Sequence, residues 1–122
     1  MPDFTRKTKE QAMAQEAFSR VSIRQKENNF EDYKTFALSF PTLIHSCGLV
    51  QAVAFAAARD KKIFLEDLEA VFKVIDAKGD LQRRSREAGI MDYMRISRHA
   101  LTAASWIKRY CQAMERSDNL AE

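Results

Sequence analysis

Residues that interrupt helices are scarce in this sequence, which contains three glycines and two prolines among 122 residues. Glycine and proline are the strongest local signals for turns and chain breaks, so their scarcity favours long helices with short connections. No segment alternates apolar and polar residues with the period of two that a half-buried β-strand requires. The sequence therefore predicts an all-α protein.

The chain is too short for several domains, because roughly 100–200 residues build one hydrophobic core. Hydrophobic residues make up 46% of the sequence and charged residues 30%, which is ordinary for a globular domain. We expect one compact domain over residues 1–122, with mobile ends at residues 1–7 and 117–122.

Cysteine is also rare, and the two cysteines, Cys47 and Cys111, have neither a CxxC spacing nor the dense pattern of a secreted scaffold. Both lie in stretches with apolar periodicity, which favours reduced core cysteines. The first ten residues mix charges with no apolar run behind them, a pattern that excludes a secretory signal. We therefore expect a cytoplasmic protein.

Charged residues are missing between Thr35 and Ala58, a stretch long enough for a transmembrane helix. However, Pro41 and Gly48 interrupt it, and hydrocarbon does not satisfy polar side chains such as Gln51. We therefore predict a buried central helical hairpin and no membrane span. Within it, Pro41 is expected to break the helix or start a new one.

Apolar residues elsewhere recur at three- and four-residue intervals, which predicts a bundle of about five to six helices. The expected boundaries are a capping box of Thr8 and Gln11, a turn at Asn29, helix ends at Gly48 and Gly79, a helix from Leu49 to Arg59 closed by Lys61 and Lys62, and a helix opened by Glu66 and Asp67. The segment 80–89 holds three arginines and little apolar content, so we expect a solvated short helix or a mobile loop there.

The final helix, from about Met91 to Arg116, has the clearest pattern. Its apolar residues form one continuous stripe: Tyr93, Ile96, Ala100, Ala104, Ile107, Cys111 and Met114. Trp106 lies at the border of this stripe. Its ring is suited to stack on a base or to anchor a partner, although half-buried packing is the commoner role of a tryptophan.

Catalytic motifs are absent from the sequence. The two histidines, His45 and His99, have no metal-binding spacing, and three scattered glycines do not build a phosphate-binding loop. His45 and Cys47 are two residues apart on a helix, so their side chains diverge and do not form a dyad. We predict no enzymatic activity, no catalytic residue, no metal site and no cofactor.

Acidic residues are missing from the final helix between Asp92 and Glu115. The polar side of this helix carries cations without intervening carboxylates, an arrangement that suits phosphate contact, although a solvated helix surface is the alternative. The candidate nucleic-acid-binding residues are Arg95, Arg98, Lys108 and Arg109, with Lys61 and Lys62. Such cations contact the backbone, so base identity should matter little.

Two stretches carry the patterns of a known family. Residues 40–55 contain Pro41, a small residue, Leu-Ile, a polar pair, Gly-Leu, Gln-Ala and Ala-Phe in that order. The second stretch has Asp92-Tyr93, then Ala100-Leu101, then Trp106-Ile107-Lys108-Arg109-Tyr110. With Arg6, Thr8, Glu10 and Gln11 at the start, these patterns span nearly the whole chain. They resemble the small helical subunit of the type III-B (Cmr) CRISPR RNA-guided effector complex.

The resemblance implies a helical bundle that stacks in several copies as the inner filament of an antiviral ribonucleoprotein complex. The implied partners are other Cmr subunits, copies of this chain, guide RNA and target RNA. Target cleavage in such complexes resides in other subunits, so the resemblance implies no catalytic residue. The main alternative is a helical protein–protein adaptor without nucleic-acid contact.

The sequence departs from the family pattern at two positions. Cys47 stands where the family commonly has asparagine before glycine, and His99 stands where an acid is usual before Ala-Leu. Both departures concern local capping or a surface salt bridge, so the expected fold is unchanged.

Overall fold

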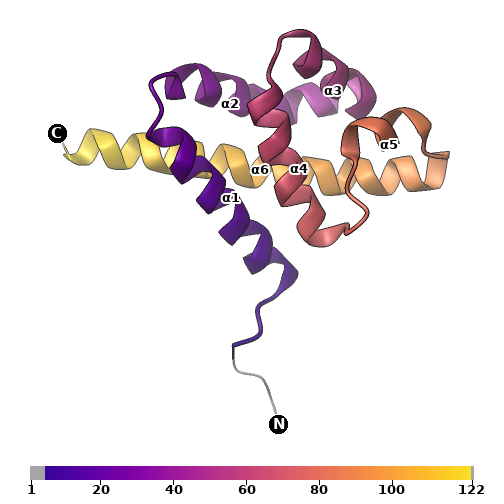
Figure 1. Cartoon of the computed structure of the whole chain (residues 1–122), viewed down its shortest axis with the longest axis horizontal. Helices are drawn as coiled ribbons and strands as arrows, with labels where there is room; N and C mark the ends of the chain where they lie inside the picture. Colours follow the sequence, from indigo (N-terminus) through magenta and orange to yellow (C-terminus); the bar gives the residue numbers. More distant parts are fainter. Residues whose placement is uncertain (1–4, 122) are drawn as a thin grey trace.

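The computed structural model describes residues 5–121, with side chains described as far as Met114. These residues form six helices and no strand, which confirms the predicted all-α class (Figure 1). The helices are α1 (Lys9–Gln25), α2 (Phe30–Cys47), α3 (Leu49–Ala58), α4 (Lys62–Ile75), α5 (Leu81–Glu87) and the long α6 (Ile90–Ala121). The expected mobile ends, residues 1–7 and 117–122, lie largely outside the described residues and side chains.

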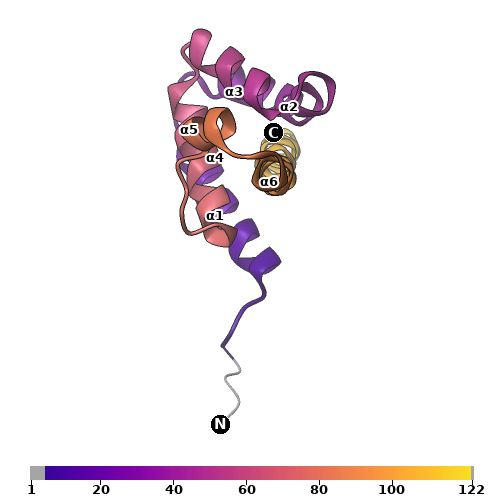
Figure 2. The ribbon, with the colours of Figure 1, turned by 90° about the vertical axis from the view of Figure 1, so that its right-hand side faces the viewer.

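Helix α6 is the element around which the others assemble, and it contacts α1, α2, α4 and α5. Seen nearly end-on, it has α1 and α4 on one side and α2 above, and its remaining side is uncovered (Figure 2). Its inward side chains are fully or almost fully buried: Ile96, Ala100, Ala103, Ala104, Ile107, Cys111 and Met114. The predicted apolar stripe is therefore confirmed, with Tyr93 only partly buried at its end.

Aromatic rings fill the space between α2 and α4. The ring of Phe64 lies 4.9 Å from that of Phe40 and 5.2 Å from that of Phe36, both in edge-to-face arrangements. Such pairs add roughly 0.5–1.5 kcal/mol each beyond the burial of their area. The buried hydrophobic residues of the described chain belong to one cluster.

Pro41 does not break its helix, so the expected interruption is wrong. Helix α2 runs without a break from Phe30 to Cys47, and Pro41 is buried inside it. Proline lacks the N–H group that the Ala37 carbonyl would accept, which costs one helical hydrogen bond. The burial of Phe40 and Ile44 on the same helix outweighs that loss, because most helix stability in proteins comes from tertiary packing.

Gly48 joins α2 directly to α3, as predicted. Its φ of +85° is a conformation that side chains with a Cβ rarely adopt. The Tyr93 hydroxyl of α6 accepts a hydrogen bond of 3.2 Å from the Val50 N–H and so satisfies one free donor at the start of α3. A Cβ at position 48 would lie 3.5 Å from this hydroxyl.

The uncharged hairpin of α2 and α3 is buried on one side only, which corrects the expectation of a buried hairpin. Leu49, Ala52 and Ala56 are inaccessible to solvent, whereas Phe55 is 40% exposed. The Phe55 ring is covered partly by the Arg59 guanidinium, 4.9 Å from the ring centroid. In the part of the chain that the structure describes, no helix is long and apolar enough to cross a membrane.

Helix α4 begins at Lys62, one turn before the expected start at Glu66. Asp60 adopts a left-handed conformation, and the Lys61 N–H donates to the Ala56 carbonyl, which closes α3 in a Schellman turn. The Lys61 carbonyl in turn accepts from the Leu65 N–H. Lys61 therefore ends one helix and opens the next.

Gly79 follows α4 but does not end it, because α4 already stops at Ile75. A Cβ at position 79 would lie 2.5 Å from an oxygen of the Glu69 side chain. That carboxylate accepts hydrogen bonds from the N–H groups of Asp80, at 2.6 Å, and Leu81, at 2.8 Å. Glu69 thus caps α5 from a neighbouring helix, which the sequence pattern does not indicate.

A buried carboxylate joins three helices. Asp67 of α4 is fully inaccessible and accepts hydrogen bonds from Arg24 of α1 at 2.9 and 3.1 Å and from the Tyr33 hydroxyl of α2 at 2.6 Å. The bond to Asp67 raises the pKa of Arg24, and burial raises the pKa of Tyr33. Arg24 therefore stays charged and Tyr33 stays protonated over the whole physiological pH range. Asp67 was expected at a helix start and instead lies in the helix interior.

Replacing Asp67 should destabilise the fold strongly. We expect Asp67→Ala to lower the free energy of unfolding by about 3 kcal/mol, because Tyr33 and Arg24 lose their buried partner. Urea denaturation of the variant measures this loss. The matched control is Glu66→Ala, an exposed carboxylate next in sequence, which should change stability by less than about 0.5 kcal/mol. Equal effects of the two substitutions would contradict the assignment.

We also expect the chain to unfold as one unit, because its described core is a single cluster. Urea transitions followed by far-ultraviolet circular dichroism and by Trp106 fluorescence should coincide. Two separate transitions would show that part of the chain folds independently.

Candidate nucleic-acid interface

The six candidate cations lie in two places. Arg95, Arg98, Lys108 and Arg109 belong to α6, whereas Lys61 and Lys62 lie at the corner between α3 and α4. Lys61 and Lys62 line one hollow of the surface, and Arg109 of the α6 group lines another. The six cations therefore do not form one continuous basic patch, although the sequence pattern suggested one group of candidates.

Arg98 and Arg109 occupy the uncovered side of α6. Both are exposed and lie opposite the buried stripe around Ala100 and Ile107. Arg98 forms no ion pair with any side chain that the structure describes, and the guanidinium of Arg109 lies 5.9 Å from the Trp106 ring centroid. Lys108 is half-buried beside this surface. We call Arg98 and Arg109, with Thr102 and Ser105 between them, the outer face of α6.

Arg95 differs from these residues because it is already paired with acids. It forms a close ion pair with Asp92, and its guanidinium lies 3.8 Å from Asp76. Arg84 of α5 completes the cluster by donating to Asp76 at 2.9 and 3.0 Å and to Asp92 at 3.4 Å. Two cations face two carboxylates, so the cluster is neutral and offers little attraction to a phosphate.

The segment 80–89 is neither fully solvated nor a loop. It contains the short helix α5, whose residues Leu81, Arg84 and Ser85 are buried. A short helix was expected, but the expectation that it is solvated is wrong for its buried side. Arg83 on the exposed side pairs with Asp80 and Glu87. The Arg83 pairs follow the three- and four-residue spacing of a helix, whereas the partners of Arg84 lie outside the segment and become apparent only in the fold.

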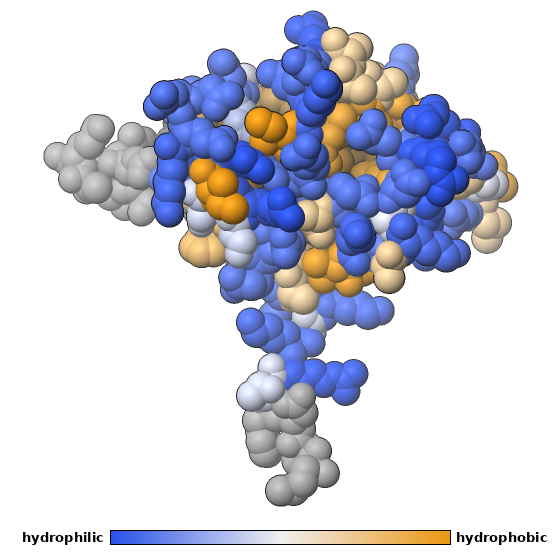
Figure 3. Space-filling view, viewed as in Figure 1, coloured by the Kyte–Doolittle hydropathy of each residue, from blue (hydrophilic) through white to orange (hydrophobic). Residues whose placement is uncertain are grey.

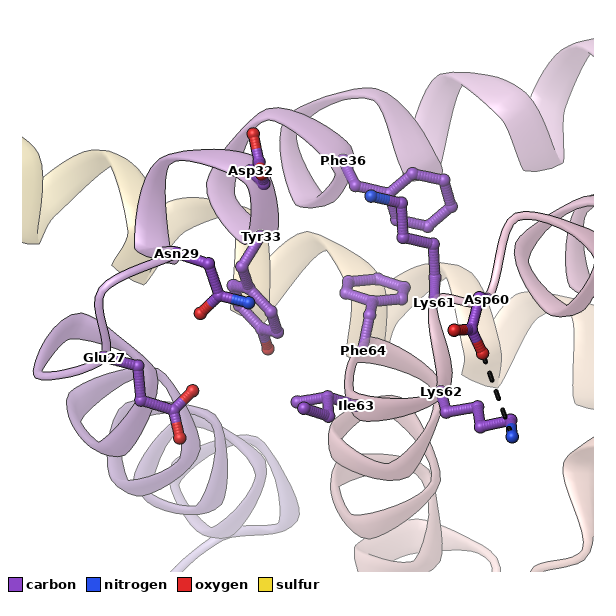
Figure 4. A pocket seen from close by; sticks show the side chains of 10 residues that line it. All are labelled: Glu27, Asn29, Asp32, Tyr33, Phe36, Asp60, Lys61, Lys62, Ile63 and Phe64. Carbon is purple, nitrogen blue, oxygen red and sulfur yellow. Dashed lines mark ion pairs between the residues drawn. The ribbon is translucent and has the colours of Figure 1, made fainter.

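Lys61 and Lys62 line a hollow of about 350 Å³ between the first half of α2 and the start of α4 (Figure 4). The Lys61 ammonium lies 5.4 Å from the Phe36 ring centroid, and Lys62 lies 3.8 Å from Asp60. Three carboxylates line the same hollow: Glu27, Asp32 and Asp60. Acids therefore outnumber these two lysines, so the hollow suits a phosphate less well than the outer face of α6 does.

The face of the molecule shown in Figure 3 is mostly hydrophilic, with small separate hydrophobic areas.

Trp106 is held in a row of aromatic rings on the seam between α6 and α1. Its ring stacks on Tyr110 at 6.0 Å with an interplanar angle of 20°. Tyr110 in turn meets Phe18 of α1 edge-to-face at 5.5 Å. Trp106 is half-buried, as the packing interpretation predicts, but part of it lines a surface hollow.

The residues suited to acid–base or nucleophilic chemistry are dispersed. His45 and Cys47 are exposed at the end of α2, which corrects the expectation that Cys47 lies in the core. Burial raises the pKa of the Cys111 thiol to about 12, and burial together with Arg95 lowers the pKa of His99. Among the described residues, no group of three or more His, Cys, Asp or Glu is placed to hold a metal ion.

Fold and surface together define a small all-α protein whose longest helix presents an acid-poor basic face. The sequence model of the family described as "CRISPR-associated protein (Cas_Cmr5)" matches residues 9–114, which include every helix from the start of α1 to the middle of α6. The chain therefore belongs to the Cmr5 family of CRISPR-associated proteins, and the resemblance seen in its motifs is confirmed.

Similarity to the Cmr5 family of Thermus thermophilus extends to both sequence and structure. The curated "CRISPR system Cmr subunit Cmr5" is 36% identical over 111 residues, which cover 88% of this chain and 96% of the relative. The crystal structure of a CRISPR-associated Cmr5 family protein from the same organism superposes with a TM-score of 0.79 at 36% identity. The match covers 88% of this chain and 97% of that one, so the likeness extends over the whole fold.

The cluster of Arg84, Asp76 and Asp92 should make stability depend on pH in the acid range. The bond from Arg84 lowers the pKa of Asp76 below its ordinary value of 3.8. A lowered folded-state pKa stabilises the protein at pH values above the ordinary pKa, and this stabilisation is lost as the pH falls through the folded-state value. We expect Arg84→Met to destabilise the protein at neutral pH, with a difference from wild type that shrinks below about pH 4.

Urea denaturation at a series of pH values measures this difference. Arg86→Met is the matched control, because Arg86 is exposed on the same helix and its side chain donates a hydrogen bond to the Gln82 carbonyl but forms no ion pair with a described residue. A difference between Arg84→Met and wild type that stays constant down to the lowest pH would contradict the assignment.

Proposed function

We propose that this chain is a non-catalytic subunit of a type III-B (Cmr) CRISPR ribonucleoprotein complex in the cytoplasm. In this proposal it stacks in several copies as the inner filament and supports binding of the guide RNA–target RNA duplex in antiviral defence. Its partners are other Cmr subunits and further copies of itself. The observation that supports the RNA role is the outer face of α6, where Arg98 and Arg109 are exposed without a described carboxylate partner.

Cations on a helix surface attract phosphates irrespective of sequence. One copy offers few such cations, so the isolated chain should bind RNA weakly. Arrayed copies raise the effective concentration of these contacts, so affinity should arise in the assembled complex and fall steeply with salt. This behaviour suits a complex in which base pairing with the guide supplies the specificity.

A protein-binding role is supported by a second surface. Ile90, Met91 and Met94 at the start of α6 are 75%, 79% and 52% exposed, which is unusual for large apolar side chains. Neighbouring apolar side chains of this kind are typical of protein contacts. This surface fits packing against other subunits, and it also fits the alternative function of an adaptor without RNA contact.

Charge reversal on the outer face of α6 separates these functions. We expect Arg98→Glu with Arg109→Glu to weaken target-RNA binding by the reconstituted complex. The slope of log affinity against log salt should fall by about one for each phosphate that the variant no longer neutralises. The measurement is RNA affinity at several salt concentrations, with assembly checked by native mass spectrometry. Arg95 is left unchanged, because its ion pairs would make a folding defect indistinguishable from a failure to bind RNA.

The matched control reverses Lys26 and Lys78, two exposed lysines on other elements, and so changes the net charge by the same amount. It should leave the salt slope unchanged. If the α6 variant assembles and keeps both the affinity and the slope of wild type, the outer face of α6 is a solvated surface and the adaptor function is favoured.

A further inference from the structure

A hollow of about 310 Å³ lies beside the outer face of α6, at its seam with α1. It is lined by Glu10, Leu101, Thr102, Ser105, Trp106 and Arg109. Ligand pockets usually start at about 300 Å³, so this volume suits one ring system and not a chain segment. The proposed function explains the nearby cations but assigns no role to this hollow.

Trp106 forms a fixed wall of the hollow. Tyr110 stacks nearly parallel to the indole, and Arg109 lies over it at 5.9 Å. Tyr110 is itself held by the edge-to-face contact with Phe18. An aromatic side chain that is immobilised in this way loses little entropy when another ring stacks on it.

Apart from Arg109, the polar groups in the hollow disfavour a phosphate but accept a neutral ring. The Thr102 hydroxyl donates to the Arg98 carbonyl at 3.1 Å, and the Ser105 hydroxyl donates to the Leu101 carbonyl at 2.8 Å. Their protons are therefore occupied, and their oxygen atoms remain as acceptors. Glu10 adds a carboxylate, which repels an anion. The cationic groups, Arg109 in the hollow and Arg98 further along α6, lie on the outer face of the helix.

We propose that this hollow receives an unpaired RNA base, which stacks on Trp106 while Arg98 and Arg109 contact the flanking phosphates. The proposal rests on the RNA-binding role given above and adds a second kind of contact to it. Stacking on an aromatic ring tolerates every base, because each base has a π-face. Binding would remain independent of sequence but would require unstacked nucleotides, which a continuous duplex does not offer.

The wild-type chain carries its own reporter, because Trp106 is its only tryptophan. At low ionic strength, a short single-stranded oligoribonucleotide should quench Trp106 fluorescence. An abasic oligomer of the same length should bind through its phosphates without quenching, and a blunt duplex should quench little. Equal spectra with all three RNAs, under conditions where fluorescence anisotropy of labelled RNA shows binding, would overturn the stacking proposal while the phosphate contacts remain.

The reconstituted complex provides a second test that does not depend on binding by the isolated chain. Trp106→Leu should lower the affinity for a target with unpaired nucleotides roughly ten-fold, without changing the salt slope, because stacking releases no counterions. Trp106→Phe keeps a ring and should retain most of the affinity. Circular dichroism and native mass spectrometry confirm folding and assembly of both variants.

The outcomes separate the two proposals. If Trp106→Leu binds as tightly as wild type, the stacking contact is refuted. If instead the charge-reversed Arg98 and Arg109 variant binds as wild type does, the RNA role of the whole face fails, and stacking fails with it. Fluorescence that responds to added Cmr subunits and never to RNA would assign the hollow to a protein contact and overturn the proposal.

Discussion

The structure depends first on burial of the inward side of α6. That side is lined mainly by small or unbranched residues, among them Ala100, Ala103 and Ala104, so that α1, α2 and α4 approach it closely. Helices α1, α2, α4 and α5 pack against this helix, and its remaining side stays uncovered. The core side and the candidate interface are therefore two sides of one helix, and packing of the core side fixes the orientation of the other.

Hydrophobic packing alone would allow neighbouring helices to slide, and two ionic clusters restrict this freedom. Asp67 connects α1, α2 and α4 at one end, and Asp76 with Arg84 connects the α4–α5 corner to α6 at the other. Buried ion pairs add little net stability over apolar packing, but removing one partner is costly. We infer that they favour one arrangement of the helices, in which Arg98, Trp106 and Arg109 keep a constant relation to the seam with α1.

The sequence alone was sufficient to predict those features that interactions between neighbouring residues determine. Periodicity located the apolar stripe of α6, the Thr8 capping box is present with hydrogen bonds in both directions, and Gly48 ends α2. The failures involve partners distant in sequence. Pro41 remains helical because other helices bury its neighbours, and Asp67 is buried because Arg24 and Tyr33 reach it from earlier helices.

At the candidate interface, too, the sequence predicted local features and missed partners that are distant along the chain. A helical wheel places Arg95, Arg98 and Arg109 on one polar side, but it does not show that Asp76 approaches Arg95 from α4. Likewise, the wheel places Trp106 at a border, whereas the hollow beside it requires Glu10 of α1. Only the family motifs, which depend on order along the whole chain, carried functional information that single-helix patterns lacked.

The approach of Glu69 to the backbone at Gly79 couples two positions that lie on different sides of a turn. The carboxylate occupies the space that a side chain at position 79 would need, so the corner holds either a bridging acid or a Cβ, but not both in this geometry. A lineage that replaces the glycine would strain the backbone at its φ of +59° and would displace the side chains of Glu69 and Lys73, which weakens the capping of α5 by Glu69. Substitutions at the two positions are consequently expected to arise together, as a correlated pair, which adds an evolutionary constraint to a turn that already supplies Asp76 and the Gly79 carbonyl to Arg84.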